Sequence, residues 1–89
     1  MYYVYVLECA DDSSWYIGYT KDLRTRLKDH QNKRGRRTTA MKNNLNLIYY
    51  EAYIEKLDAM GREKFLKGGS GRTYLKKQLK HYFEKNIQL

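Results

Sequence analysis

The chain has 89 residues and a formal net charge of +8, with 18 Lys and Arg residues against 10 Asp and Glu. This length predicts one domain, spanning residues 1–89, and no apolar run is long enough to cross a membrane. The N-terminus shows no basic segment ahead of an apolar one, so we expect no secretory signal and a cytoplasmic protein. The single cysteine, Cys9, cannot form an internal disulfide, and with only two histidines the sequence offers no structural zinc site.

Two short segments near the N-terminus predict a β-hairpin. Residues 2–7 and 15–19 are rich in aromatic and β-branched side chains, and the linker between them is built mostly of the turn formers Asp and Ser. Because side chains alternate between the two faces of a strand, Tyr5 and Tyr16 can lie on the same face. Gly18 interrupts the second strand, where a glycine usually marks the close approach of a backbone or a ligand.

The next segment predicts a basic helix that starts with Thr20 as its N-cap and ends at His30. Leu23 and Leu27 are four residues apart, and Arg26 and His30 fall three and seven residues after Leu23, so they share its side of the helix. An inward arginine and an inward histidine indicate contact with the sheet. The alternatives are a surface arginine and a histidine that interacts with the helix C-terminus.

Positive charge is concentrated in one part of the chain. Residues 21–42 carry nine bases and two acids, whereas residues 1–20 carry three acids and no base. Such a block favours binding to a polyanion, and nucleic acid, most simply DNA, is the expected partner. A solvated basic surface is the alternative, and a membrane-surface helix would need a broad apolar face that is absent. The candidate contacts are Lys21, Arg24, Lys33, Arg34, Arg36 and Arg37.

The remaining segments complete the predicted fold. Residues 45–54 form the longest strand, which could occupy the centre of the sheet, and residues 55–67 form a helix that ends in a left-handed Gly68. Ser70 caps a final helix whose apolar side comprises Leu75, Leu79, Tyr82 and Phe83. The order β-β-α-β-α-α indicates an α+β fold, a three-stranded antiparallel sheet flanked by helices.

A glutamate lies on the apolar side of the helix at residues 55–67. Glu63 shares that side with Ala59, Met60 and Leu66, and a partly desolvated carboxylate is costly unless a cation or a donor compensates it. The compensating group is either a bound metal ion or an internal partner such as Arg26.

These side chains include the groups that phosphodiester hydrolysis requires. A carboxylate binds a hard divalent cation, an arginine stabilises the growing phosphate charge, and a phenol or an imidazole positions or deprotonates water. Composition alone leaves three functions open, namely a nuclease, a non-catalytic nucleic-acid-binding module and a protein-interaction domain.

A resemblance narrows the choice. Tyr3-Val4-Tyr5, Tyr16-Ile17-Gly18, Asp22-Leu23 followed by Arg26 and His30, and Arg62-Glu63 together resemble the GIY-YIG nuclease family, in particular its small, stand-alone, single-domain bacterial members. The resemblance runs from Tyr2 to about Leu79. It implies a three-stranded antiparallel sheet flanked by helices and phosphodiester cleavage that depends on one Mg²⁺ or Mn²⁺ ion. We therefore expect a structure-selective DNA endonuclease that acts in repair or recombination, and the alternative is a non-catalytic nucleic-acid-binding module that keeps the fold.

The resemblance also implies a role for each matching residue. Tyr5 lies close to the attacking water as a possible general base, and Tyr16 supports the same water. Arg26 contacts the phosphate, and His30 has an auxiliary or proton-shuttling role. Gly18 leaves room at the sheet surface, and the metal ligand is Glu63.

The chain departs from the family pattern at several positions. Tyr3 stands where the first glycine of the family name is expected, which is tolerated if the backbone there needs no positive φ. Val4 replaces isoleucine, a conservative change. Thr38 or Thr39 stands where some members have a basic residue or tyrosine, and Asn86 is a weak match to their C-terminal asparagine.

Overall fold

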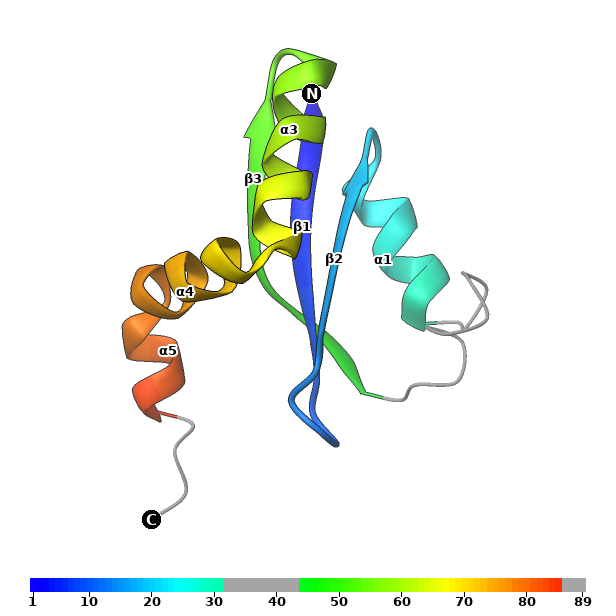
Figure 1. The fold of residues 1–89 in the computed structure, drawn as a ribbon. Coiled ribbons are helices and arrows are strands. Elements are labelled where there is room, and N and C mark those ends of the chain that lie inside the picture. Colours follow the sequence, from blue (N-terminus) through cyan, green and yellow to red (C-terminus); the bar gives the residue numbers. More distant parts are fainter. Residues whose placement is uncertain (32–43, 86–89) are drawn as a thin grey trace.

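The computed structural model describes residues 1–31 and 44–85, which form an antiparallel sheet with helices on both faces (Figure 1). This confirms the expected α+β fold and element order, with the last helix divided in two. The elements are β1 (Tyr2–Cys9), β2 (Trp15–Thr20), α1 (Leu23–Gln31), β3 (Leu45–Tyr53), α3 (Lys56–Lys67), α4 (Gly69–Gln78) and α5 (Lys80–Lys85).

The sheet has the order β2-β1-β3, so the first strand is central. The prediction that residues 45–54 form the central strand was therefore wrong. β1 contains four consecutive buried side chains, from Val4 to Leu7, so it is buried on both faces of the sheet. β3 is longer but has four exposed residues among its nine. A run buried on both faces, rather than length, marks the central strand here.

Helices cover the two faces of the sheet with separate sets of apolar side chains. Tyr5, Leu7 and Cys9 face α1, where Leu23 and Leu27 pack against them. On the other face, Val4 and Val6 of β1 pack against α3 and α4. The buried cluster there comprises Val4, Val6, Ala59, Leu66 and Leu75. In Figure 1, the edge strand β2 runs between α1 and α3.

Several helix ends differ from the expected ones. Asp22, not Thr20, caps α1, because its carboxylate accepts hydrogen bonds from the backbone N–H of Thr25 (3.1 Å) and from the Thr25 hydroxyl (2.8 Å). Gly68 is extended (φ −84°, ψ 173°) rather than left-handed, and it serves α3 as C-cap and α4 as N-cap, so Ser70 lies inside α4.

The last helical segment is interrupted. Leu79, which has φ −104° and ψ 32°, ends α4, and α5 begins one residue later. Leu75 is fully buried, whereas Tyr82 and Phe83 are half-buried and Phe83 stacks on Trp15 of β2, with ring centroids 5.5 Å apart. None of the helices in the described parts of the chain has the length and apolar character needed to cross a bilayer.

Candidate active site

A cleft of about 350 Å³ lies at the β2 edge of the sheet, between α1 on one face and α3 on the other. Its lining includes every residue that the sequence suggested for catalysis, for close backbone approach or for metal binding. These six residues are Tyr5, Tyr16, Gly18, Arg26, His30 and Glu63. They come from four different elements, so tertiary folding alone brings them together.

Strand pairing positions the hairpin residues. Tyr5 of β1 is directly opposite Gly18 of β2, and Leu7 is directly opposite Tyr16. Opposite residues of an antiparallel pair share a face, so both tyrosines and the glycine lie on the α1 side of the sheet, as expected.

Gly18 is needed for space. A Cβ atom added at this position would lie 2.3 Å from the Tyr5 hydroxyl oxygen and 2.5 Å from its Cζ atom. The φ angle of Gly18 is not positive, so backbone freedom does not explain the residue. The missing side chain lets the Tyr5 ring lie across the second strand with its hydroxyl in the cleft.

His30 fixes the Tyr5 hydroxyl from the opposite side. Its Nε2 atom lies 3.2 Å from the hydroxyl oxygen, and the two rings meet edge to face with centroids 5.9 Å apart. Burial lowers the pKa of His30, and the positive charge of Arg26 lowers it further, so the imidazole is neutral at pH 7. The buried Nδ1 atom has no hydrogen-bond partner among the described residues.

Arg26 is exposed and lines two adjoining hollows. One is the cleft, and the other lies beside the end of β2, where Arg26 is joined by Lys21 and Lys56. The guanidinium can therefore meet a ligand from solvent. We expected Arg26 on the inward side of α1. Its side chain does border the cleft, but it is exposed rather than buried against the sheet.

Glu63 lies on the α3 side of the cleft, with about a quarter of its side chain exposed (24%). Its Oε2 atom is 3.0 Å from the ammonium of Lys67, one helical turn later, so its partner is Lys67 rather than Arg26. Ala59 and Leu66 are buried as expected, but Met60 is 43% exposed, so the apolar side of α3 is narrower than predicted.

The donor set is compatible with a magnesium ion that keeps much of its water. The described residues contain no group of three or more His, Cys, Asp or Glu side chains around one position. Mg²⁺ is commonly held by one or two carboxylates together with water and substrate phosphate, so Glu63 alone can supply the protein's share. In this structure the positive charge beside the Glu63 carboxylate is the ammonium of Lys67.

The basic residues proposed to bind nucleic acid are only partly accounted for. Lys21 and Arg24 line a separate hollow between α1 and the sheet. Lys33, Arg34, Arg36 and Arg37 lie outside the described residues, as do Thr38, Thr39 and Asn86.

Two features of the surroundings were missed in the sequence. Lys67 could have been found from its four-residue spacing from Glu63. The second feature is Glu51 of β3, which accepts two hydrogen bonds from Arg62 of α3 (2.9 and 3.0 Å) and one each from the hydroxyls of Tyr49 and Tyr53. No local pattern links Glu51 with Arg62, because the contact depends on how α3 packs on β3.

This polar cluster fixes the helix that carries Glu63. Burial alone would raise the pKa of Glu51, but the hydrogen bonds from Arg62, Tyr49 and Tyr53 outweigh burial and lower it, so the carboxylate stays charged. The guanidinium of Arg62 also lies 4.4 Å from the ring centroid of Tyr74 in α4. Arg62 thus holds α3 against β3 and α4, and Glu63 is the next residue.

A comparison with protein-family models matches residues 1–86 to the GIY-YIG catalytic domain. The chain belongs to the GIY-YIG family. The match spans nearly the whole chain and includes the six cleft residues that the sequence suggested. It confirms the resemblance drawn from the motifs and places the chain in a family of nuclease domains.

Similar proteins are small GIY-YIG proteins named UPF0213. One from Streptococcus pneumoniae is 45% identical over 65 residues, which cover 73% of this chain and 65% of that protein. One from Limosilactobacillus reuteri is 39% identical over 82 residues, 90% of this chain and 84% of the relative. The chain thus spans just under two thirds of some of these relatives and most of others.

A solved structure agrees with this assignment. The solution NMR structure of a UPF0213 protein from Bacillus halodurans is 34% identical, has a TM-score of 0.55, and matches 88% of this chain and 85% of its own. Within this GIY-YIG chain, Tyr3 stands in place of the glycine of the family name. Its φ is not positive, so a side chain is accommodated there without strain.

Proposed function

We propose that the chain is an endonuclease that hydrolyses phosphodiester bonds of DNA with the help of a divalent metal ion, Mg²⁺ or Mn²⁺. The observation that carries this proposal is the cleft, where a hydrogen-bonded phenol and neutral imidazole face an exposed guanidinium and a carboxylate. The branched or nicked DNA of repair and recombination is the proposed substrate, in the cytoplasm beside the nucleoid.

The phenol and the imidazole would act on the attacking water. In the tautomer with the proton on Nδ1, the Nε2 atom of His30 accepts a hydrogen bond from the Tyr5 hydroxyl. As Tyr5 takes a proton from water, it can pass its own proton to His30, whose lowered pKa keeps the ring neutral and ready to accept it. Tyr16, on the same face of the sheet, helps to position the water.

The charged groups would act on the phosphate. Arg26 offers a planar fork of N–H donors to the phosphate oxygens, whose charge grows in the transition state. Glu63 would hold the metal ion, which when bound supplies positive charge to the leaving oxygen. Lys67 would have to release the Glu63 carboxylate, and its exposed, flexible side chain allows this.

The Glu63–Lys67 ion pair also favours a second function. In a non-catalytic nucleic-acid-binding module, Lys67 would neutralise Glu63 permanently and no metal ion would bind. The experiment that separates the two functions replaces Glu63 with Gln, which keeps the shape of the side chain and removes its charge.

Cleavage of branched, nicked and linear DNA should be measured with Mg²⁺, with Mn²⁺ and with a chelator. For the Glu63→Gln variant we expect cleavage to fall by about 10²-fold to 10³-fold, because several kcal/mol of transition-state stabilisation are lost. Duplex binding should stay intact or tighten. Glu84→Gln on α5, which also removes a helical glutamate beside a basic residue, is the matched control and should cleave normally.

Thermal unfolding gives an independent measurement. Metal should raise the melting temperature of the wild type by mass action and that of Glu63→Gln less. Metal-independent melting of the wild type, together with DNA binding and no cleavage, would favour the binding module. Cleavage by Glu63→Gln at the wild-type rate would exclude the assignment of Glu63.

A further inference from the structure

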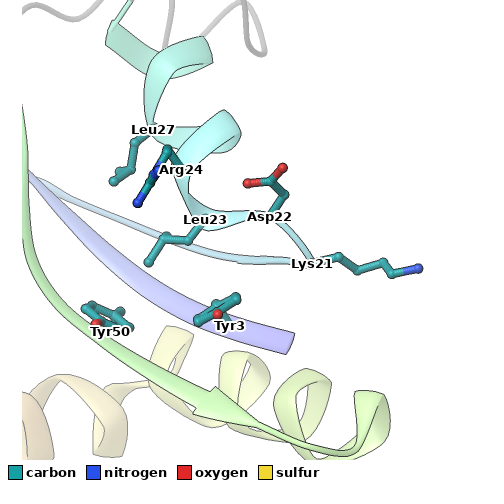
Figure 2. Close-up of a pocket in the computed structure, with 7 residues that line it drawn as sticks. All are labelled: Tyr3, Lys21, Asp22, Leu23, Arg24, Leu27 and Tyr50. Atoms are coloured by element: carbon teal, nitrogen blue, oxygen red, sulfur yellow. The ribbon is translucent and has the colours of Figure 1, made fainter. Parts of the chain in front are cut away.

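The separate hollow that Lys21 and Arg24 line has a volume of about 380 Å³ and lies between α1 and the half of the sheet formed by β1 and β3. Figure 2 shows its lining, with Tyr3 and Tyr50 on the sheet and Arg24 on the helix above them. Leu23 and Leu27 form the apolar wall beneath the helix. None of these residues belongs to the lining of the catalytic cleft.

Two tyrosine rings form the floor of this hollow. The rings of Tyr3 and Tyr50 are tilted by 59°, and their centroids are 6.1 Å apart. Tyr50 is 53% exposed although it lies in the middle of a strand. An aromatic ring exposed in this way offers a flat surface on which a nucleobase can stack.

One cation faces the rings. Arg24 extends from α1 toward the sheet, whereas Lys21 extends away from the hollow (Figure 2). Asp22 also borders the hollow, but both of its carboxylate oxygens accept hydrogen bonds from Thr25. A planar apolar surface beside an available guanidinium matches a nucleotide, which presents a base and a phosphate together.

The hollow is next to the catalytic cleft on the same face of the sheet. Tyr50 is the cross-strand partner of Tyr5, and Tyr3 precedes Tyr5 by two residues, so all three share this face. Arg24 and Arg26 are two residues apart on α1, which places them on roughly opposite sides of the helix. A nucleic-acid strand that crosses α1 can therefore contact both the hollow and the catalytic cleft.

We propose that Tyr3, Tyr50 and Arg24 form a subsite for an unpaired nucleotide of a DNA strand whose phosphate backbone continues into the catalytic cleft. The subsite rests on the proposed function for its substrate class. It favours substrates in which a single-stranded stretch adjoins the cleaved bond. In such DNA the base can leave the stack without breaking a base pair, whereas an intact duplex keeps its bases stacked inside.

The test measures binding without cleavage. A single-stranded DNA oligonucleotide that contains 2-aminopurine, whose fluorescence is quenched by stacking, is titrated with protein in the presence of a chelator. We expect quenching with the wild type and with Tyr50→Phe, which keeps the ring. Tyr50→Ala should bind about 5-fold to 150-fold more weakly and lose the quenching, since one base–aromatic stack is removed.

Two further variants separate the parts of the subsite. Arg24→Gln should lower the slope of log affinity against log salt by about one unit, as expected for one phosphate contact. Ile54→Ala removes another exposed apolar side chain near the end of β3, outside the hollow, and should bind like the wild type. Circular dichroism confirms that each variant is folded.

The outcomes distinguish the subsite from the nuclease. Equal affinity and equal quenching for folded Tyr50→Ala and the wild type would overturn the subsite, whether or not the wild type cleaves DNA. Tighter binding of free deoxyadenosine monophosphate than of the oligonucleotide would overturn it as well. Quenching that depends on Tyr50 in a protein that cleaves no DNA would support the subsite and contradict the nuclease.

Discussion

At the scale of single residues, the contact between Tyr5 and Gly18 shows how the cleft depends on a missing side chain. The hydroxyl of Tyr5 occupies the space where a side chain of residue 18 would begin. Tyr5 itself is nearly buried and His30 holds its hydroxyl, so the ring can move aside only by giving up the contact with His30. A glycine that packs against a reactive group in this way has a steric role rather than a conformational one.

Replacing Gly18 with Ala should therefore displace the Tyr5 hydroxyl from His30. We expect cleavage to fall by about 10²-fold or more, the usual scale for general acid–base catalysis, and the free energy of unfolding to fall by about 1–3 kcal/mol through overpacking. Single-turnover cleavage of folded protein and urea denaturation measure the two effects. Wild-type cleavage by Gly18→Ala would show that the position of Tyr5 does not matter.

At the scale of elements, the corner between α3 and α4 is set by a second steric glycine. A Cβ atom on Gly71 would lie 2.2 Å from the carbonyl oxygen of Phe65 and 2.4 Å from Cα of Leu66. Both are backbone atoms of α3, which cannot move aside as the end of a flexible side chain can. The two helices therefore approach each other closely at this corner, where the extended Gly68 is the C-cap of α3 and the N-cap of α4.

A pair of Gly→Ala variants tests this explanation. Gly71→Ala should lower the free energy of unfolding by about 1–3 kcal/mol, because the two helices must separate. Gly61 lies within α3 and an added Cβ there meets no atom within 4 Å, so Gly61→Ala should raise it by about 0.5–1 kcal/mol. Urea denaturation measures both. If both variants changed the free energy of unfolding by the same amount, helix propensity alone would account for it and the steric role of Gly71 would be wrong.

At the scale of the whole molecule, His30 links the stability of the fold to pH. It joins α1 to the central strand through Tyr5, and burial together with Arg26 lowers its pKa below the ordinary 6.5, while Asp29 opposes the shift. In the pH range between the lowered value and 6.5, the unfolded chain binds more protons than the folded one. Stability should therefore be lost as the pH falls below 6.5.

Urea denaturation between about pH 5 and pH 7 measures this dependence. The wild type should become less stable toward low pH, and His30→Gln should show a smaller slope because the titrating group is gone. His81→Gln is the matched control, since the His81 side chain is 92% exposed, and it should keep the wild-type slope. An unchanged slope in His30→Gln would show that other groups cause the pH dependence.

Much of the candidate site could be predicted from sequence because backbone geometry fixes local periodicity. The alternation of side chains along a strand places Tyr5, Tyr16 and Gly18 on one face, and helical spacing relates Arg26 to His30. These relations hold over a few residues and need no knowledge of the fold. The motifs that they form were enough to indicate the family, which the match over residues 1–86 confirms.

Other features required the tertiary structure, because they depend on segments that are distant in sequence. Three such features are the central position of β1, the contact between Glu51 and Arg62, and the contact between the rings of Tyr3 and Tyr50. All three follow from which surfaces the whole chain can bury together. Which strand is central depends on the apolar area that the whole molecule buries, and no short stretch of sequence contains that quantity. Local geometry thus determined which side chains share a face, and packing alone decided which faces meet.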